Sequence, residues 1–524
     1  MFIKTCKRKH ASGEVYETHY LTEGYRDPKT GKVKHKHLLN LGKLPKELVV
    51  ILKEAIKKEG TVEKIKLKDV EMLSSKEYGS VVVFEKLYHD FIGDCIGRKY
   101  KDYVKAIVIN KILEPRSKNA LPNWLKLVDL KCDTDNKNFF YESLDYLEKH
   151  QERIEKKLFE KRKTEECNLY LYDITSTYFE GKGAENICKY GYSRDHRPDR
   201  VQVNIGLITD AEGFPLTVEI LEGNITDKQT LQKKVDMLKE KFGITNITFV
   251  FDRGMKTKAN LEYLKEEGYE YITALSHAQL KKKSEENEKI QMSLFDKKKI
   301  MEFIDEIEKK KYVLSHNPSK ATLDKKTRMH LIEKTEANLQ KIKELKKNYT
   351  DMEIQKKVSK KINQYKCERY INYEIKNGIL TFKRDTEKIE YDEKYDGFYM
   401  IESTNIEKTK EKIEETYKSL QLVERAFDDI KNHMEIRPVF HYKESRIKGH
   451  IFSCFLSYYL LHAFRKNTAE LLKSYSLDTL LTELRDIKKA YFKIDCFAFE
   501  KISNLSDLQK VLLKINGVRV VTSL

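Results

Sequence analysis

The sequence predicts an α/β protein built on a mixed sheet with crossover helices. Short apolar runs, each closed by an acid or a turn, recur between residues 168 and 275. They alternate with segments in which apolar residues recur at spacings of three and four, which is typical of helices. A Lys- and Glu-rich segment from about 280 to 365 interrupts this pattern before another apolar run at 397–401.

Composition restricts the function classes and the kind of partner. The 524 residues include 101 Lys and Arg against 83 Asp and Glu, a net charge of +18 that favours nucleic acid over a membrane as partner. The longest apolar stretch, 451–464, falls short of the ~20 residues that span a bilayer, and the N-terminus lacks a secretory pattern. Eight scattered cysteines without a CxxC pair favour a reducing cytoplasm, where the protein would associate with the nucleoid. The sequence has no GxxxxGK[ST] motif, which argues against an ATP-driven helicase.

The N-terminal part divides at about residue 45. Residues 1–45 are strongly basic and predict short strands, with a turn at 27–32. Residues 46–166 show mainly helical spacing, and we expect this region to bind DNA.

The central part predicts the sheet itself. Within 167–279 the expected order is strand, strand, strand, helix, strand, helix, strand. Residues 280–395 are predicted as an insertion of charged helices followed by strands, with a hairpin turn at Asn377-Gly378. The core resumes at 396–465 with a strand and a long amphipathic helix over 407–434. A helical and β-containing tail, 466–524, completes the chain.

Two acids close apolar strands of the predicted sheet. Asp173 follows the run Leu169–Tyr172, and Asp252 follows the run at 247–251. A buried carboxylate without a partner costs several kcal/mol, and two at corresponding strand ends would repel unless a cation lay between them. The alternative for each residue alone is that the aspartate caps a following helix.

A third acid lies on the amphipathic helix. Tyr417, Leu420, Glu424, Phe427 and Lys431 follow one another at steps of three and four, so we expect them on one face. An acid on this largely apolar face is unusual, although a salt bridge with a nearby Lys or Arg would also explain it. Three carboxylates suit Mg²⁺, and two such ions support displacement at phosphorus. We therefore expect Asp173, Asp252 and Glu424 to converge at one edge of the sheet for phosphodiester chemistry on nucleic acid.

Several motifs in this order resemble the bacterial DDE transposases of insertion sequences. The resemblance covers about residues 80–465 and is closest to the branch with a β-rich insertion between the second Asp and the Glu. It is carried by the segments Tyr172–Phe179, Gly191–Asp199, Phe251–Gly254, Asp396–Phe398, Tyr417…Glu424…Lys431 and Arg437–His441.

The resemblance implies an RNase H-like catalytic core in which Asp173, Asp252 and Glu424 hold two divalent ions, Mg²⁺ with Mn²⁺ as a substitute. It further implies cut-and-paste transposition: cleavage at terminal inverted repeats through a hairpin intermediate, strand transfer into double-stranded target DNA, and a synaptic homodimer. The family's helix signature has an arginine where this sequence has Leu420. This departure affects one expected phosphate contact at the transposon end and leaves the metal site intact.

Six residues are candidates for DNA contact. Arg194, Arg197 and Arg200 lie in a turn-rich segment, where exposed arginines either contact phosphates or are simply solvated. The complete set of expected DNA contacts is Tyr417, Lys431, Arg253, Arg194, Arg197 and Arg200.

Two other functions remain compatible with the sequence. One is an RNase H-like nuclease or junction resolvase without strand transfer, and the other is a DNA-binding descendant of a transposase that no longer cuts. The presence of all three acids argues against the second, and inverted repeats flanking the coding region would separate transposase from nuclease.

Overall fold

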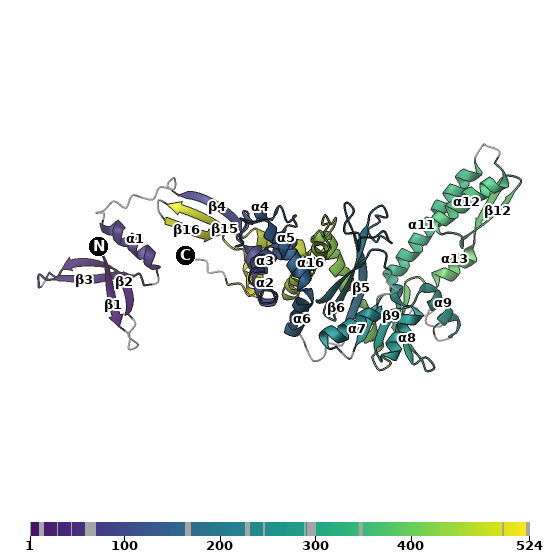
Figure 1. Ribbon diagram of the computed structural model, residues 1–524, viewed down its shortest axis with the longest axis horizontal. Coiled ribbons are helices and arrows are strands. Elements are labelled where there is room, and N and C mark those ends of the chain that lie inside the picture. The colour runs from purple at the N-terminus through teal and green to yellow at the C-terminus, as the bar shows by residue number, and fades with distance from the viewer. Residues whose placement is uncertain are drawn as a thin grey trace. The chain divides into compact units, whose positions relative to one another are not determined.

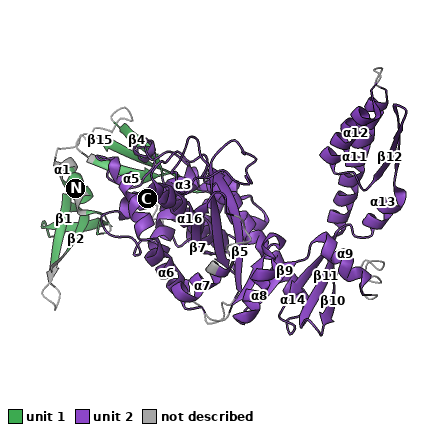
Figure 2. Ribbon diagram, turned by 45° about the vertical axis from the view of Figure 1, so that its right-hand side comes forward, with its two compact units in different colours: residues 1–77, 487–505, 521–524 green, residues 78–486, 506–520 purple. Residues whose placement is uncertain are grey.

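The computed structural model describes residues 2–9, 15–28, 30–42, 44–57, 70–162, 169–225, 231–244, 247–287, 290, 300–344, 349–494 and 497–519. The chain forms two compact units (Figure 2). The first comprises residues 1–77, 487–505 and 521–524, and the second comprises 78–486 and 506–520. The predicted boundary between residues 166 and 167 lies outside the described residues.

The described residues of the first unit form two three-stranded antiparallel sheets. One is formed by β1 (Phe2–Lys9), β2 (Val15–Arg26) and β3 (Val33–Asn40), as the strand prediction for 1–45 expects, and is followed by α1 (Lys46–Lys57). The other joins β4 (Glu71–Glu77) to β15 (Lys488–Ile494) and β16 (Phe497–Ile502). The helical prediction for 46–166 is therefore wrong at β4, which forms a strand because the distant β15 supplies its hydrogen bonds.

The second unit is built on an eight-stranded mixed sheet (Figure 1). The strand order is β10-β11-β14-β9-β8-β5-β6-β7, in which β5, β8 and β9 are parallel and the other neighbours are antiparallel. The strands are β5 (Leu169–Tyr178), β6 (Gln202–Asp210), β7 (Pro215–Glu222), β8 (Thr248–Phe251), β9 (Glu270–Ala274), β10 (Ile300–Asp305), β11 (Lys310–His316) and β14 (Phe398–Ser403). The predicted mixed α/β architecture is confirmed.

Side-chain alternation along β5 separates the two faces of this sheet. Tyr170, Tyr172 and Ile174 point into an apolar core shared with α7 (Leu231–Phe242) and α8 (Lys258–Glu266). Successive side chains of a strand point to opposite faces, so Asp173 lies on the other face. Helix α15 (Leu420–Asp428) packs against β5 there.

A helical region, built from segments on both sides of the sheet in the chain, surrounds the long buried helix α16 (Glu444–Asn467). It contains α2 (Gly79–Phe91), α3 (Lys101–Leu113), α4 (Leu121–Leu125), α5 (Asn138–Lys149), α6 (Gln151–Arg162), α17 (Leu477–Arg485) and α18 (Asp507–Ile515). The apolar stretch 451–464 lies inside α16 and is buried by protein. In the described part of the chain, no helix is long and apolar enough to cross a membrane.

The inserted segment differs from its prediction in one respect. It begins with α9 (His277–Glu285) and with β10 and β11, two strands that extend the main sheet. The sequence pattern missed these strands because their apolar residues are mixed with Lys and acids. The expected helices and hairpin follow as α11 (Pro318–Lys343), α12 (Asp351–Tyr365), β12 (Ile371–Lys376), β13 (Ile379–Arg384) and α13 (Thr386–Glu393), with α11 and α12 side by side (Figure 1). Asn377 and Gly378 both have positive φ, as the predicted hairpin turn requires.

The predicted long helix over 407–434 is interrupted. The structure has α14 (Lys410–Lys418), then α15, then a π-helical turn at Asp429–His433. Ser419 ends the first helix, and the π turn shifts the residues beyond Asp428 around the helix axis. Lys431 therefore does not continue the face that carries Glu424.

Candidate active site

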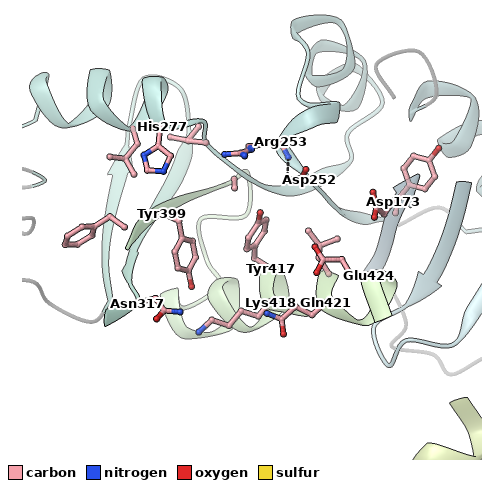
Figure 3. A pocket seen from close by; sticks show the side chains of 16 residues that line it. Asp173, Asp252, Arg253, His277, Asn317, Tyr399, Tyr417, Lys418, Gln421 and Glu424 are labelled. Atoms are coloured by element: carbon pink, nitrogen blue, oxygen red, sulfur yellow. Dashed lines mark hydrogen bonds between the residues drawn. The ribbon is translucent and has the colours of Figure 1, made fainter. Parts of the chain in front are cut away.

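A pocket of about 430 Å³ opens on the second unit (Figure 3). Its walls come from segments far apart in the chain: β5, the end of β8, β14 and the helices α14 and α15. Asp173, Asp252 and Glu424 all line it, together with Arg253 and Tyr417. Tertiary folding thus brings the three acids singled out in the sequence to one cavity.

The pairing of β5 with β8 places the two aspartates side by side. Tyr172 is paired with Phe251 in this parallel ladder, so Asp173 and Asp252 are the next residues of adjacent strands. Asp252 does follow the last residue of β8, as expected. Asp173 does not end its strand, because β5 continues to Tyr178 against the antiparallel β6.

The two aspartates differ in their local contacts. Asp252 Oδ1 accepts a hydrogen bond of 2.7 Å from the Arg253 amide and caps a 3₁₀ turn at Arg253–Met255. The capping alternative therefore holds for Asp252, which is nonetheless exposed at the pocket. Asp173 is half-buried, and its Oδ1 accepts a 2.7 Å hydrogen bond from the Ile174 amide.

Glu424 reaches the same pocket from α15. The sequence predicts Glu424 on a largely apolar, buried face of the helix, but its side chain is exposed. The reason is that the pocket interrupts the packing of α15 on the sheet. Figure 3 shows Glu424 pointing toward Asp173 and Asp252. Among the described residues, Glu424 forms no ion pair, so the salt-bridge alternative finds no support there.

The three carboxylates influence one another electrostatically. Burial raises the pKa of Asp173 to about 7; the negative charges of Asp252 and Glu424 add to this rise, and Arg194 opposes it. Burial and the charge of Asp252 also raise the pKa of Glu424. Burial together with both acids raises the pKa of Tyr417 to about 12, so this phenol stays protonated at neutral pH. The pocket therefore disfavours the simultaneous ionisation of its acids.

The acids share the pocket without forming a tight cluster. Within the part of the chain that the structure describes, no three His, Cys, Asp or Glu side chains lie close enough together to hold one metal ion. Three carboxylates repel one another, which opposes closer approach. Their chemistry is that of hard oxygen donors, which Mg²⁺ and other hard divalent cations prefer.

The predicted DNA contacts fall into two groups. Arg253 and Tyr417 line the pocket, as does the buried Leu420 at the position of the family's arginine. Lys431 instead lies outside the pocket lining, where its Nζ donates a 2.7 Å hydrogen bond to Asp195 Oδ1.

The arginines of the turn-rich segment are engaged within the protein. Arg197 donates two hydrogen bonds of 2.9 Å to the carboxylate of Asp199. Arg200 forms an ion pair with Glu180, with 3.0 Å between Nη2 and Oε2. The Arg194 amide donates to Ser176 Oγ at 3.0 Å, and its charge acts on Asp173.

The acid that pairs with Lys431 was not predicted from the sequence. Asp195, whose side chain is only 2% exposed, accepts from both Lys431 and Arg437. Arg194-Asp195 lies within a motif that carried the resemblance, but an aspartate in a polar loop gives no local sign of burial. Asp195 lies 236 and 242 positions before Lys431 and Arg437, so only the tertiary structure reveals the contact.

Two transposase family models match the chain. A family described as "Transposase DDE domain" matches residues 170–460, and one described as "IS1634 family transposase, N-terminal domain" matches residues 3–65. No curated protein matches the chain.

Six chains of solved structures also match. One, described as "Crystal structure of a pre-cleavage Mos1 transpososome", is 13% identical, and the match covers 44% of this chain and 68% of that chain. Its TM-score of 0.15 supports no structural argument. The first family match spans more than half of the chain and contains all three acids, and the protein therefore belongs to the DDE transposases of insertion sequences.

Proposed function

We propose that this transposase cuts DNA at the ends of its insertion sequence and joins those ends to target DNA, with Asp173, Asp252 and Glu424 as the catalytic acids. The observation that carries the proposal is their position on one pocket, although 79 and 172 residues separate them in the chain. All three lie within the transposase family match. Cut-and-paste movement is the form of transposition proposed.

The proposed core is RNase H-like. It consists of the consecutive strands β7-β6-β5-β8-β9, in which β6 is antiparallel to its neighbours and β8 and β9 run parallel to β5. In this arrangement the inserted β10 and β11, with β14, extend one edge. The insertion thus adds to the sheet beside the pocket instead of interrupting it.

The donor set fits a pair of divalent ions, for which we propose Mg²⁺, with Mn²⁺ able to substitute. Burial is the largest cause of the raised pKa values of Asp173 and Glu424, and repulsion between the acids adds to it; a bound cation would offset both effects. Asp173, Asp252 and Glu424 would hold the ions, which when bound would activate a water or a 3′-hydroxyl and stabilise the leaving oxygen.

Other residues of the pocket would position the DNA. Tyr417 is protonated at neutral pH and can donate a hydrogen bond to a phosphate oxygen, while Arg253 supplies positive charge at the same wall. Lys431, Arg197 and Arg200 remain proposed contacts, but each would have to exchange an acid of this chain for a phosphate. Residues 1–45 and 46–166 are the proposed DNA-reading regions, and the synaptic complex is proposed to be a homodimer.

The test uses the full chain and DNA that contains the ends of its element. Asp252→Asn should abolish cleavage in Mg²⁺ while leaving DNA affinity within about threefold, because contacts of Lys and Arg with phosphates supply most of the affinity. Glu415→Gln is the matched control: this glutamate is exposed on α14, pairs with Lys412 and does not line the pocket.

Undiminished cleavage by Asp252→Asn would refute the catalytic assignment. Strand transfer is scored separately, by joining of pre-cleaved ends to a target plasmid. Cleavage without joining would favour a nuclease over a transposase.

A further inference from the structure

A second cavity, of about 270 Å³, lies in the helical region of the same unit. It is formed by the end of α3, the loop that follows it, the segment 435–441 and the start of α16. Basic and aromatic groups dominate its lining, including Lys111, Lys118, Arg437, Phe440, His441 and His450. None of these residues lines the acidic pocket.

Two lysines of this cavity are almost fully buried. Lys111 and Lys118 are each only 4% exposed. Lys111 Nζ donates hydrogen bonds of 3.1 and 3.2 Å to the carbonyls of Met434 and Glu435. Lys118, in contrast, forms no hydrogen bond or ion pair among the described residues. Burial and the charge of Lys111 lower the pKa of Lys118 to about 7. A buried ammonium without an acid is unstable by several kcal/mol, and an anion would relieve this.

The histidines add polar atoms without adding negative charge. His450 Nε2 lies 3.2 Å from the Ile436 carbonyl, to which it donates, and its buried Nδ1 has no partner in the described chain. Burial and the nearby lysine charges lower the pKa of His441 to about 4. Arg116 and Arg437 are already paired, with Glu114 and Asp195. Among the described residues that line the cavity, Lys118 is therefore the cation that is left for a ligand.

The surroundings of the cavity favour a phosphate that belongs to DNA. Phe440 lines it with 64% of its surface exposed, which suits stacking with a base. The neighbouring Val439 bridges to Phe179, six residues beyond Asp173 along β5 and its extension. At ~3.3 Å per residue, Asp173 and Phe179 are about 20 Å apart along the strand, which is the length of roughly six base pairs of duplex. The segment that carries Phe440 thus bridges to the extension of the strand that carries Asp173, and this spacing is within the length of one bound DNA end.

We propose that this cavity binds a backbone phosphate of DNA through Lys118, with Phe440 against an adjacent base. The proposal rests on the proposed function in taking DNA as the substrate. It adds a DNA contact outside the carboxylate pocket, built from a part of the motif Arg437–His441 that the catalytic proposal does not use.

The first experiment compares Lys118→Met with Lys126→Met, both in the full chain. Lys126 is an exposed lysine eight residues away that does not line the cavity, so its replacement makes the same change in charge. Binding to the DNA end is measured in EDTA across salt concentrations. Loss of one phosphate contact should make the negative slope of log K against log salt shallower by about 0.9. Relative to 1 M salt, the mutant then loses about eightfold in affinity at 0.1 M salt compared with wild type. The Tm of Lys118→Met should not fall, because an uncompensated buried cation is replaced by an apolar chain of similar length.

A second experiment locates the phosphate. Single methylphosphonates, which lack the phosphate charge, are introduced in turn along the DNA end. One position should weaken binding to the wild type and have no further effect on Lys118→Met, because the two changes remove the same contact.

Two results would overturn the proposal. The first is equal affinity and slope for Lys118→Met and Lys126→Met. The second is that inorganic phosphate raises the Tm of the wild type but not of Lys118→Met, while the two proteins bind DNA equally. This result would assign the cavity to a small phosphate. Binding is measured without cleavage, so an error in the catalytic assignment would leave the Lys118 difference intact.

Discussion

Glu402 is expected to be a major source of stability in the second unit, because it joins the inserted strands to the sheet core. It lies on β14 and is 2% exposed. Its Oε2 accepts a hydrogen bond of 2.5 Å from Lys256, and its Oε1 accepts from Tyr271 at 2.5 Å and from Lys310 at 3.0 Å. These partners come from the segment after β8, from β9 and from β11. Burial alone would raise the pKa of Glu402, but Lys256 with Tyr271 and Lys310 holds it below its ordinary value.

Glu402→Ala leaves Lys256 buried without its acid and removes the acceptor of the Tyr271 hydroxyl. Removing one partner of a buried ion pair costs about 3–5 kcal/mol, so we expect a loss of that size in the free energy of unfolding. Glu402→Gln keeps the shape and one acceptor and should lose less. Because the folded pKa is lowered, the stabilisation is present above the ordinary glutamate pKa and is lost as the pH falls through the folded value. The difference between wild type and Glu402→Ala should therefore shrink in acid.

The assay is urea unfolding followed by the fluorescence of Trp124, the sole tryptophan, which is buried in the second unit. Far-ultraviolet circular dichroism provides a second probe. Glu411→Ala, an exposed glutamate on α14, is the control and should change stability by less than about 0.5 kcal/mol. If Glu402→Ala and Glu411→Ala unfold at the same urea concentration, the contacts of Glu402 do not stabilise the unit.

Two further predictions concern the pocket and the helical region. Asp173 has a folded pKa near 7, raised above the unfolded value, so its ionisation destabilises the fold progressively as the pH rises from about 4 to above 7. Asp173→Asn should be more stable than wild type at pH 8 in EDTA, by at most about 4 kcal/mol, and equally stable below pH 4. Tm is measured for both proteins against pH, and a Tm difference that does not change with pH would contradict the prediction. Gly449→Ala should lower Tm, because a Cβ there would lie 2.0 Å from the Leu144 carbonyl oxygen where α16 crosses α5; an unchanged Tm would show that the helices can separate without loss.

Local periodicity in the sequence was sufficient for the order of elements in the core. Apolar runs predicted β5, β6, β7, β8 and β9, and spacings of three and four predicted the helices between them, because both patterns arise from neighbouring residues. The same runs singled out Asp173 and Asp252, since a carboxylate next to buried apolar residues is locally conspicuous. Glu424 was conspicuous for the same reason on its helix.

Pairing between distant segments was decided only by the tertiary structure. Nothing near β4 in the sequence indicates that residues 488–494 will supply its hydrogen bonds, nor that β10 and β11 extend the main sheet. The break at Ser419 and the π turn at 429–433 depend on packing, so the helical face assigned to Lys431 was misjudged. Lys111 and Lys118 line the same cavity as His450, although more than 300 residues separate them from it in the chain. Sequence periodicity records which face of an element is buried, whereas only the folded chain determines what lies against that face.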